Sequence, residues 1–157
     1  MNIKILQIGK TEEKFLQIGI EEYANRLHKY INVDIITLPN LKNSKNLKPE
    51  QVKQGEAKLI LEQMSKVDYA ILLDEHGEKF RSVAFADYLQ KQFNSGKKTL
   101  MFIIGGAFGF SDEIYEKAHF KIALSDMTFS HQMIRLLFME QLYRAMTILR
   151  NEPYHNE

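Results

Sequence analysis

The chain has 157 residues, a formal net charge of +1 at pH 7 and no cysteine. Its length, with 45% hydrophobic and 26% charged residues, fits one ordinary domain with a complete core. Because the chain has no cysteine, it cannot form disulfides or thiolate metal sites. It also cannot be an enzyme that methylates a pyrimidine carbon through a covalent thiolate adduct. The small net charge does not indicate a nucleic-acid-binding protein. That function would require a local basic cluster, or a dimer that combines two basic patches.

Strands and helices alternate along the whole chain. In chain order, we predict a strand at 3–8, a helix at 12–30, a strand at 33–38, a polar loop rich in Asn and Lys at 39–48, a helix at 49–66, a strand at 69–73, a turn at 74–79, a helix at 82–94, a strand at 99–104, a short helix at 111–118, a strand at 121–124 and a closing helix at 130–150. Ser82 and Ser130 are the expected N-caps of their helices. This pattern predicts one α/β domain over residues 1–157, with a mostly parallel sheet covered by helices on both faces.

No segment has the properties of a membrane span or a signal peptide. The longest apolar runs, such as 100–104, are far shorter than the roughly 20 residues that span a bilayer. The N-terminal segment alternates polar and apolar residues and lacks a basic segment followed by a long apolar stretch. We therefore expect a cytoplasmic protein without a membrane partner.

Three loops are the candidate ligand-binding segments, because ligands of parallel sheets bind beyond the carboxyl ends of the strands. They are residues 73–77, 105–110 and 125–129. The second is rich in glycine but lacks dinucleotide and phosphate-loop spacing, so a tight turn is an equal alternative. The third contains small polar and apolar residues without clustered charge. It suits an adenine and a methionine tail better than a pyrophosphate, unless it is an ordinary connecting loop.

Histidine and arginine residues near the C-terminus are candidate functional-site residues. His131 flanks the third loop and His155 lies in the tail, and no histidine spacing indicates a metal site. Glu140 and Arg144 share a helix face at spacing i and i+4. They form either a surface ion pair of little energetic value or a pair in which Glu140 holds Arg144 against a phosphate or base.

Several motifs together resemble the RlmH family of SPOUT-class RNA methyltransferases. They are Lys-Ile-Leu-Gln-Ile-Gly-Lys at 4–10, Leu-Asp at 73–74 with Gly-Glu-Lys at 77–79, Ile-Gly-Gly-x-x-Gly at 104–109, Ser-Asp-Met-Thr-Phe-Ser-His-Gln-Met-Ile-Arg at 125–135, Glu-Gln-Leu-Tyr-Arg-Ala at 140–145 and Pro-Tyr-His at 153–155. The resemblance covers essentially the whole chain, and its last third is the most specific part. One departure is Ser130, where the family pattern often has proline.

The resemblance implies a fold, a cofactor and a substrate. The fold would include a deep trefoil knot in the C-terminal part, and the active form would be a homodimer in which one subunit's knot and the other's tail form the RNA site. The substrate would be N3 of pseudouridine 1915 in helix 69 of 23S rRNA on assembled ribosomes. The S-adenosylmethionine pocket would be lined by Leu73, Gly105, Leu124, Ser125, Asp126, Met127, Thr128 and Phe129.

Methyl transfer to a ring nitrogen requires alignment of the reactants and removal of the N3 proton. We hypothesise that His155, or less favourably His131, accepts this proton, while Arg144 and Tyr154 hold the RNA. For each of these residues, the alternative is a purely structural role in holding the tail. Two other functions are kept open: a SPOUT enzyme acting on another RNA such as transfer RNA, and a non-catalytic ribosome-binding protein.

Overall fold

Five parallel strands form one sheet in the order β2-β1-β4-β3-β5. The computed structural model describes residues 1–156. The elements are β1 (Asn2–Ile8), α1 (Lys14–Leu27), β2 (Asn32–Leu38), the short 3-10 helix η1 (Ser44–Asn46), α2 (Pro49–Met64), β3 (Tyr69–Lys79), α3 (Ser82–Phe93), β4 (Thr99–Ile104), α4 (Asp112–Lys117), β5 (Phe120–Ala123) and α5 (Met133–Leu149). The predicted α/β class, with a parallel sheet and helices on both faces, is confirmed.

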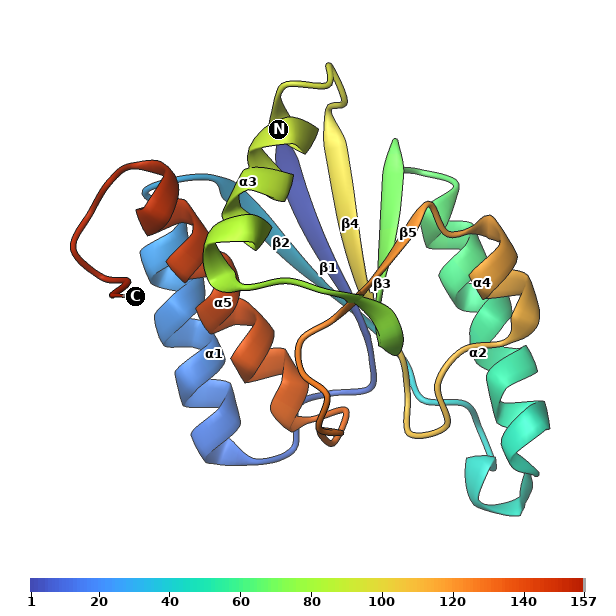
Figure 1. Ribbon diagram of the computed structural model, residues 1–157. Helices are drawn as coiled ribbons and strands as arrows, with labels where there is room; N and C mark the ends of the chain where they lie inside the picture. The colour runs from blue at the N-terminus through green and yellow to red at the C-terminus, as the bar shows by residue number, and fades with distance from the viewer. Residues whose placement is uncertain (157) are drawn as a thin grey trace.

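Two helix layers cover the sheet, with α1, α3 and α5 on one face and α2 and α4 on the other (Figure 1). Side chains alternate along β1, so that Ile3 and Ile5 face the first layer and Leu6 and Ile8 face the second. The central strand β4 is buried on both faces from Leu100 onward. Its nearly continuous apolar sequence is typical of a strand covered on both sides.

The predicted turn at 74–79 is wrong, because β3 continues to Lys79. Leu73 and Glu78 both pair with Ile122 of β5, so the residues between them bulge out before the pairing resumes. A Cβ on Gly77 would lie 2.5 Å from the backbone of Ile122. Glycine therefore permits the close approach of the two backbones that extends β3.

Serine residues lie at three helix starts, but they do not all act as N-caps. Ser111 accepts a hydrogen bond from the amide of Ile114 as the N-cap of α4. Ser130 accepts one from the amide of Met133 at 3.1 Å, but it is not the predicted N-cap, because α5 begins at Met133 and its N-cap is Gln132. The predicted cap at Ser82 is wrong, since Ser82 is already helical and its hydroxyl instead donates to Gln141 of α5 at 2.9 Å. Ser82 thus joins α3 to α5.

The chain crosses itself where β5 leads toward α5. In Figure 1 the segment after β5 crosses the segment that joins β3 to α3. Helix α5 then packs between α1 and α3. The crossing is consistent with the knot that the family resemblance implies, and the knot itself stays a prediction.

Within residues 1–156, no helix is long and apolar enough to cross a bilayer.

Candidate active site at the carboxyl edge of the sheet

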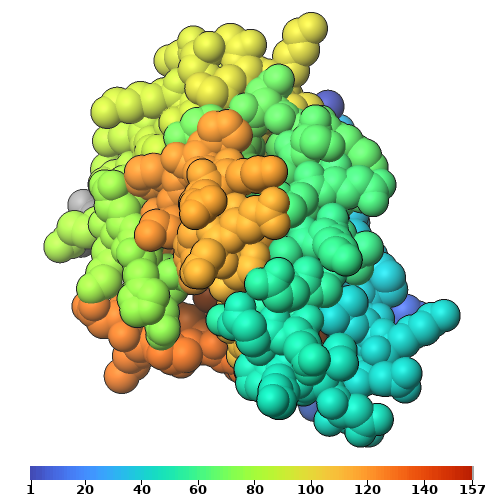
Figure 2. Space-filling view, turned by 90° about the vertical axis from the view of Figure 1, so that its right-hand side faces the viewer, coloured from blue at the N-terminus to red at the C-terminus, as the bar shows by residue number. Residues whose placement is uncertain are grey.

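A cavity of about 930 Å³ lies where the segments after β3, β4 and β5 meet. Figure 2 shows the molecule hollowed between these segments and α2. The predicted cofactor residues that line it are Leu73, Gly105, Leu124, Ser125, Met127, Thr128 and Phe129. All three loops that the sequence indicated as ligand-binding segments therefore reach one cavity, because parallel strands end at the same edge of the sheet.

The glycine-rich loop after β4 forms one wall of this cavity. Gly106 and Gly109 form an isolated bridge, in which the Gly109 amide donates to the Gly106 carbonyl at 3.2 Å. Gly109 has a φ of 79°, a backbone conformation that side chains rarely adopt. The glycines thus make a tight turn and also expose backbone to the cavity, so the two interpretations of this motif are compatible.

The loop at 124–129 is attached to the end of β3 by two polar contacts. The Thr128 hydroxyl donates to Glu75 at 3.2 Å, and Asp126 forms an ion pair with Lys79. The side chain of Asp126 is 81% exposed, and Asp126 is not among the residues that line the cavity. Of the predicted cofactor residues, Asp126 is therefore the one whose side chain points elsewhere.

A hydrogen bond fixes Asp74 where the first segment enters the cavity. The Tyr115 hydroxyl donates to the Asp74 carboxylate, which also accepts from the amide of His76 at 2.9 Å. Burial, followed by this hydrogen bond, raises the pKa of Tyr115 above its ordinary value. Tyr115 therefore stays protonated as a donor, and it joins α4 to the edge of the cavity.

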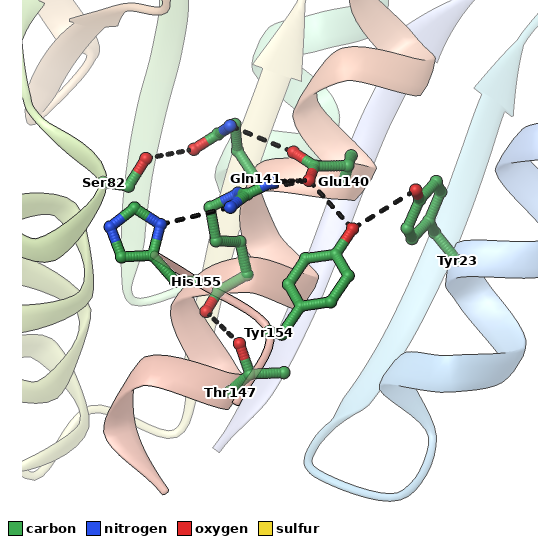
Figure 3. Close-up of polar contacts among 8 residues, drawn as sticks. Tyr23, Ser82, Glu140, Gln141, Thr147, Tyr154 and His155 are labelled. Atoms are coloured by element: carbon green, nitrogen blue, oxygen red, sulfur yellow. Dashed lines mark hydrogen bonds and ion pairs between the residues drawn. The ribbon is translucent and has the colours of Figure 1, made fainter. Parts of the chain in front are cut away.

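The predicted tail residues gather around Glu140 on α5 (Figure 3). Arg144 donates to Glu140 Oε1 through Nε at 3.1 Å and through a terminal nitrogen at 2.5 Å. Tyr154 donates to the same oxygen at 3.0 Å, and Arg144 also lies 3.1 Å from Nδ1 of His155. The Arg144 and Glu140 side chains are 24% and 20% exposed. The pair is thus part of a half-buried network rather than an isolated surface ion pair.

A second, smaller cavity connects this network with the candidate cofactor loop. It has a volume of about 470 Å³ and is lined by Glu140, His155, Leu124 and Phe129, among other residues. Leu124 and Phe129 line the larger cavity as well. The tail network and the candidate cofactor cavity therefore lie on opposite sides of a wall that these two side chains help to form.

His131 lies apart from the tail network, in the lining of the larger cavity. Burial, and then the nearby charge of Arg135, lower its pKa. Both effects favour the neutral form of the His131 imidazole and make it a weaker proton acceptor. The two histidines that the sequence singled out thus occupy different cavities.

The sequence analysis did not identify two buried charged residues beside these cavities. Arg135 is 2% exposed and donates to the carbonyls of Ile8, Gly9 and His131 at 2.6 to 3.1 Å, which fixes the start of α5 against the end of β1. Glu56 is 6% exposed and lies against Gly106. Both occur in helices whose apolar pattern does not distinguish them from surface residues, so only packing reveals them.

No group of three or more His, Asp or Glu side chains suited to a metal ion occurs within residues 1–156.

Comparisons with known proteins agree with this architecture. Residues 1–155 match a family described as "Predicted SPOUT methyltransferase". The chain is 57% identical to the ribosomal RNA large subunit methyltransferase H of Flavobacterium johnsoniae and 51% identical to that of Phocaeicola vulgatus, over the full length of both proteins in each comparison.

Solved structures of lower sequence similarity share the fold. A probable methylase family protein from Haemophilus influenzae Rd KW20 superposes with a TM-score of 0.56 at 11% identity, over 99% of this chain and 70% of that one. A probable methyltransferase from Bordetella pertussis Tohama I gives a TM-score of 0.55 at 12% identity, over 92% and 93% of the two chains. The family match and the full-length relatives extend over both cavities and the tail. The chain therefore belongs to the SPOUT methyltransferase family and, within it, to the group of ribosomal RNA large subunit methyltransferase H proteins.

Proposed function

We propose that the protein transfers a methyl group from S-adenosylmethionine to N3 of pseudouridine 1915 in helix 69 of 23S rRNA, acting in the cytoplasm on assembled ribosomes. The observation that carries this proposal is the convergence of three loops, each indicated by the sequence, on one cavity of about 930 Å³. Relatives that align over the full length and are named as large-subunit rRNA methyltransferases support it.

The cavity fits the proposed cofactor in size and in chemistry. Its volume lies within the usual range of small-molecule sites, roughly 300–1,000 Å³. Apolar side chains such as Leu73, Leu124 and Phe129 suit an adenine, and the backbone of Gly105 and Gly106 is open to close approach by a ribose or a methionine tail. Cofactor-binding roles are assigned to Leu73, Gly105 and residues 124–129, with Asp126 contributing through its backbone.

The proposed chemistry needs positioning more than a protein nucleophile. When bound, the cofactor supplies a methyl group on a sulfonium, which a deprotonated ring nitrogen attacks in line. The chain's own residues would hold the base, remove its N3 proton and exclude water. Arg144, fixed by Glu140, would bind a phosphate or the base together with Tyr154, and His155 would accept the proton directly or through water.

A basic surface beside the cavity supports RNA as the substrate. Residues 39–49 contain three exposed lysines, Lys42, Lys45 and Lys48, and no acidic residue. They follow β2, at the same edge of the sheet as the cavity, and Lys53 of α2 continues the row into the cavity lining. This is the local basic cluster that a nearly neutral chain requires for binding RNA phosphates.

Exposed apolar side chains support a homodimer. Phe15 and Ile18 of α1 are 58% and 59% exposed, and Met133 at the start of α5 is 36% exposed. The amide of Glu12 donates to Gln132 at 2.9 Å, so the starts of α1 and α5 lie together. A second copy seated on this face would bury these side chains.

The decisive experiment measures transfer of labelled methyl groups from S-adenosylmethionine to ribosomes from a strain that lacks the endogenous enzyme. The modified nucleotide is mapped by mass spectrometry. A single product at the helix 69 pseudouridine is expected. Cofactor binding without transfer to ribosomes would instead favour another RNA, such as transfer RNA, and the absence of cofactor binding would favour a non-catalytic ribosome-binding protein.

A further inference from the structure

Glu56 is a buried carboxylate without a counter-charge. It lies in the middle of α2 and is 6% exposed, and its Oε1 atom is fully buried without a hydrogen-bond partner. Burial raises its pKa to about 6, so the side chain still carries its charge at pH 7 and above. An unpaired buried charge is strongly unfavourable for folding, and such groups are concentrated at functional sites.

The carboxylate lies directly behind the glycine-rich wall of the larger cavity. A Cβ built on Gly106 would meet the two Glu56 oxygens at 2.7 and 2.8 Å. Gly106 itself lines the cavity, whereas Glu56 is not among the lining residues. One glycine backbone therefore separates the charge of Glu56 from the cavity, and a ligand can experience this charge without touching the side chain.

The other charges of the cavity are placed where they act more weakly on a ligand. Lys53, one turn before Glu56, forms an ion pair with Glu50 at 3.0 Å. Asp74 is already engaged by Tyr115, and Glu75 accepts a hydrogen bond from Thr128. Glu75, Asp112 and Lys121 are exposed. Solvent screens exposed charges, whereas a charge in the interior is screened much less. Glu56 is thus a buried negative charge directly behind the glycine-rich wall, where solvent screens it little.

Methyl transfer changes the charge of the cofactor by one unit. S-adenosylmethionine has a sulfonium, an ammonium and a carboxylate, for a net charge of +1. The electron pair of the broken sulfur–carbon bond stays on sulfur, the nitrogen lone pair forms the new bond, and the N3 proton leaves to a base. S-adenosylhomocysteine is therefore a neutral thioether with the same adenosine and amino-acid groups. A fixed negative charge distinguishes the two.

We propose that Glu56 makes the cavity selective for the sulfonium donor over the thioether product, by placing one negative charge behind Gly106. This inference rests on the proposed function, because it assumes that the cavity binds S-adenosylmethionine. Two unit charges about 10 Å apart at an effective dielectric constant of about 20 interact strongly enough to change an equilibrium constant roughly tenfold. The same charge would add nothing to the binding of the spent cofactor, because the thioether has no net charge.

The test compares the binding of both cofactor forms to the full chain by calorimetry at pH 8. For Glu56→Gln, which keeps the shape of the side chain and removes its charge, the Kd for S-adenosylmethionine should rise about tenfold. The Kd for S-adenosylhomocysteine should change by less than about twofold, because that ligand has no net charge. Glu56→Asp keeps the charge and should retain part of the preference for S-adenosylmethionine over S-adenosylhomocysteine.

Glu62→Gln is the matched control, since Glu62 lies on the same helix with a side chain that is 67% exposed and paired with Lys66. Glu62→Gln should leave the Kd values for both cofactor forms unchanged. Equal weakening of both ligands by Glu56→Gln would overturn the proposal and leave Glu56 a purely structural support of the loop. Unchanged binding of both ligands would overturn it too. A wild-type chain that binds neither ligand would instead refute the proposed function, and this inference with it.

Discussion

At the scale of single residues, the charge of Glu56 should reduce the stability of the protein. Its pKa rises from 4.5 to about 6 on folding. A group whose pKa is raised in this way binds protons more tightly in the folded chain. The contribution of Glu56 to stability is therefore most favourable below pH 4.5 and is lost as the pH rises through about 6. A shift of about 1.5 units corresponds to roughly 2 kcal/mol.

We therefore expect Glu56→Gln to be more stable than the wild type by about 1–2 kcal/mol at pH 8, and to show little difference at pH 4.5. Urea unfolding at pH 4.5 and pH 8 measures the difference in unfolding free energy between the variant and the wild type. Glu62→Gln serves again as the control and should show no such pH-dependent gain. A variant that is less stable than the wild type at pH 8 would mean that the carboxylate has a stabilising partner in the folded chain.

Arg135 should have the opposite effect on stability. Its guanidinium satisfies three backbone carbonyls and the hydroxyl of Thr11 in an environment that is almost fully buried. Arg135→Met would leave these carbonyls without donors and should cost about 3 kcal/mol of unfolding free energy. Lys117→Met, at an exposed residue that pairs with Glu113, should cost less than about 0.5 kcal/mol. Denaturant unfolding of both variants checks the difference.

At the scale of elements, the C-terminal tail is held on α5 through the Glu140 network, in which His155 lies against Arg144. The proposed role of His155 as proton acceptor can therefore be tested by replacing it. His155→Ala should lower the single-turnover methylation rate by about 10²-fold or more if the imidazole accepts the N3 proton. Cofactor affinity should stay unchanged. His28→Ala, at an exposed histidine before β2, is the control and should have the wild-type rate. An unchanged rate for His155→Ala would exclude that role.

The elements also indicate what sequence can and cannot predict. The continuous apolar run of β4 and the alternation of β1 predict strands because each depends on local pattern alone. The second half of β3 was missed because it depends on pairing with Ile122, more than 40 residues later. Parallel topology places the three loops at one edge of the sheet, so most of the cavity lining could be predicted. The burial of Glu56 could not be predicted from the sequence, because it depends on the packing of α2 against Gly106.

At the scale of the whole molecule, the lysines after β2 should contribute affinity for ribosomes without contributing to the chemistry. Replacing Lys42, Lys45 and Lys48 together by alanine should weaken ribosome binding and reduce the slope of log affinity against log salt by about 2 units. Cofactor affinity should be unaffected. Binding measured across a salt series gives the slope.

The matched control replaces Lys29, Lys66 and Lys98, which are exposed and precede β2, β3 and β4. They lie at the opposite edge of the sheet, so the same loss of charge should leave the salt slope nearly unchanged. Equal effects of the two triple variants would show that only net charge matters, and that the residues after β2 are not a binding surface.

Three residues, Ala123, Leu124 and Phe129, line both cavities, and this shared lining has a consequence for the order of binding and release. Because Leu124 and Phe129 belong to both linings, a ligand that displaces them in one cavity also changes the shape of the other. Any effect of this kind is reciprocal. If RNA at the tail side tightens cofactor binding by some factor, the cofactor tightens RNA binding by the same factor. An enzyme built in this way would hold its methyl donor most firmly when a target is in place.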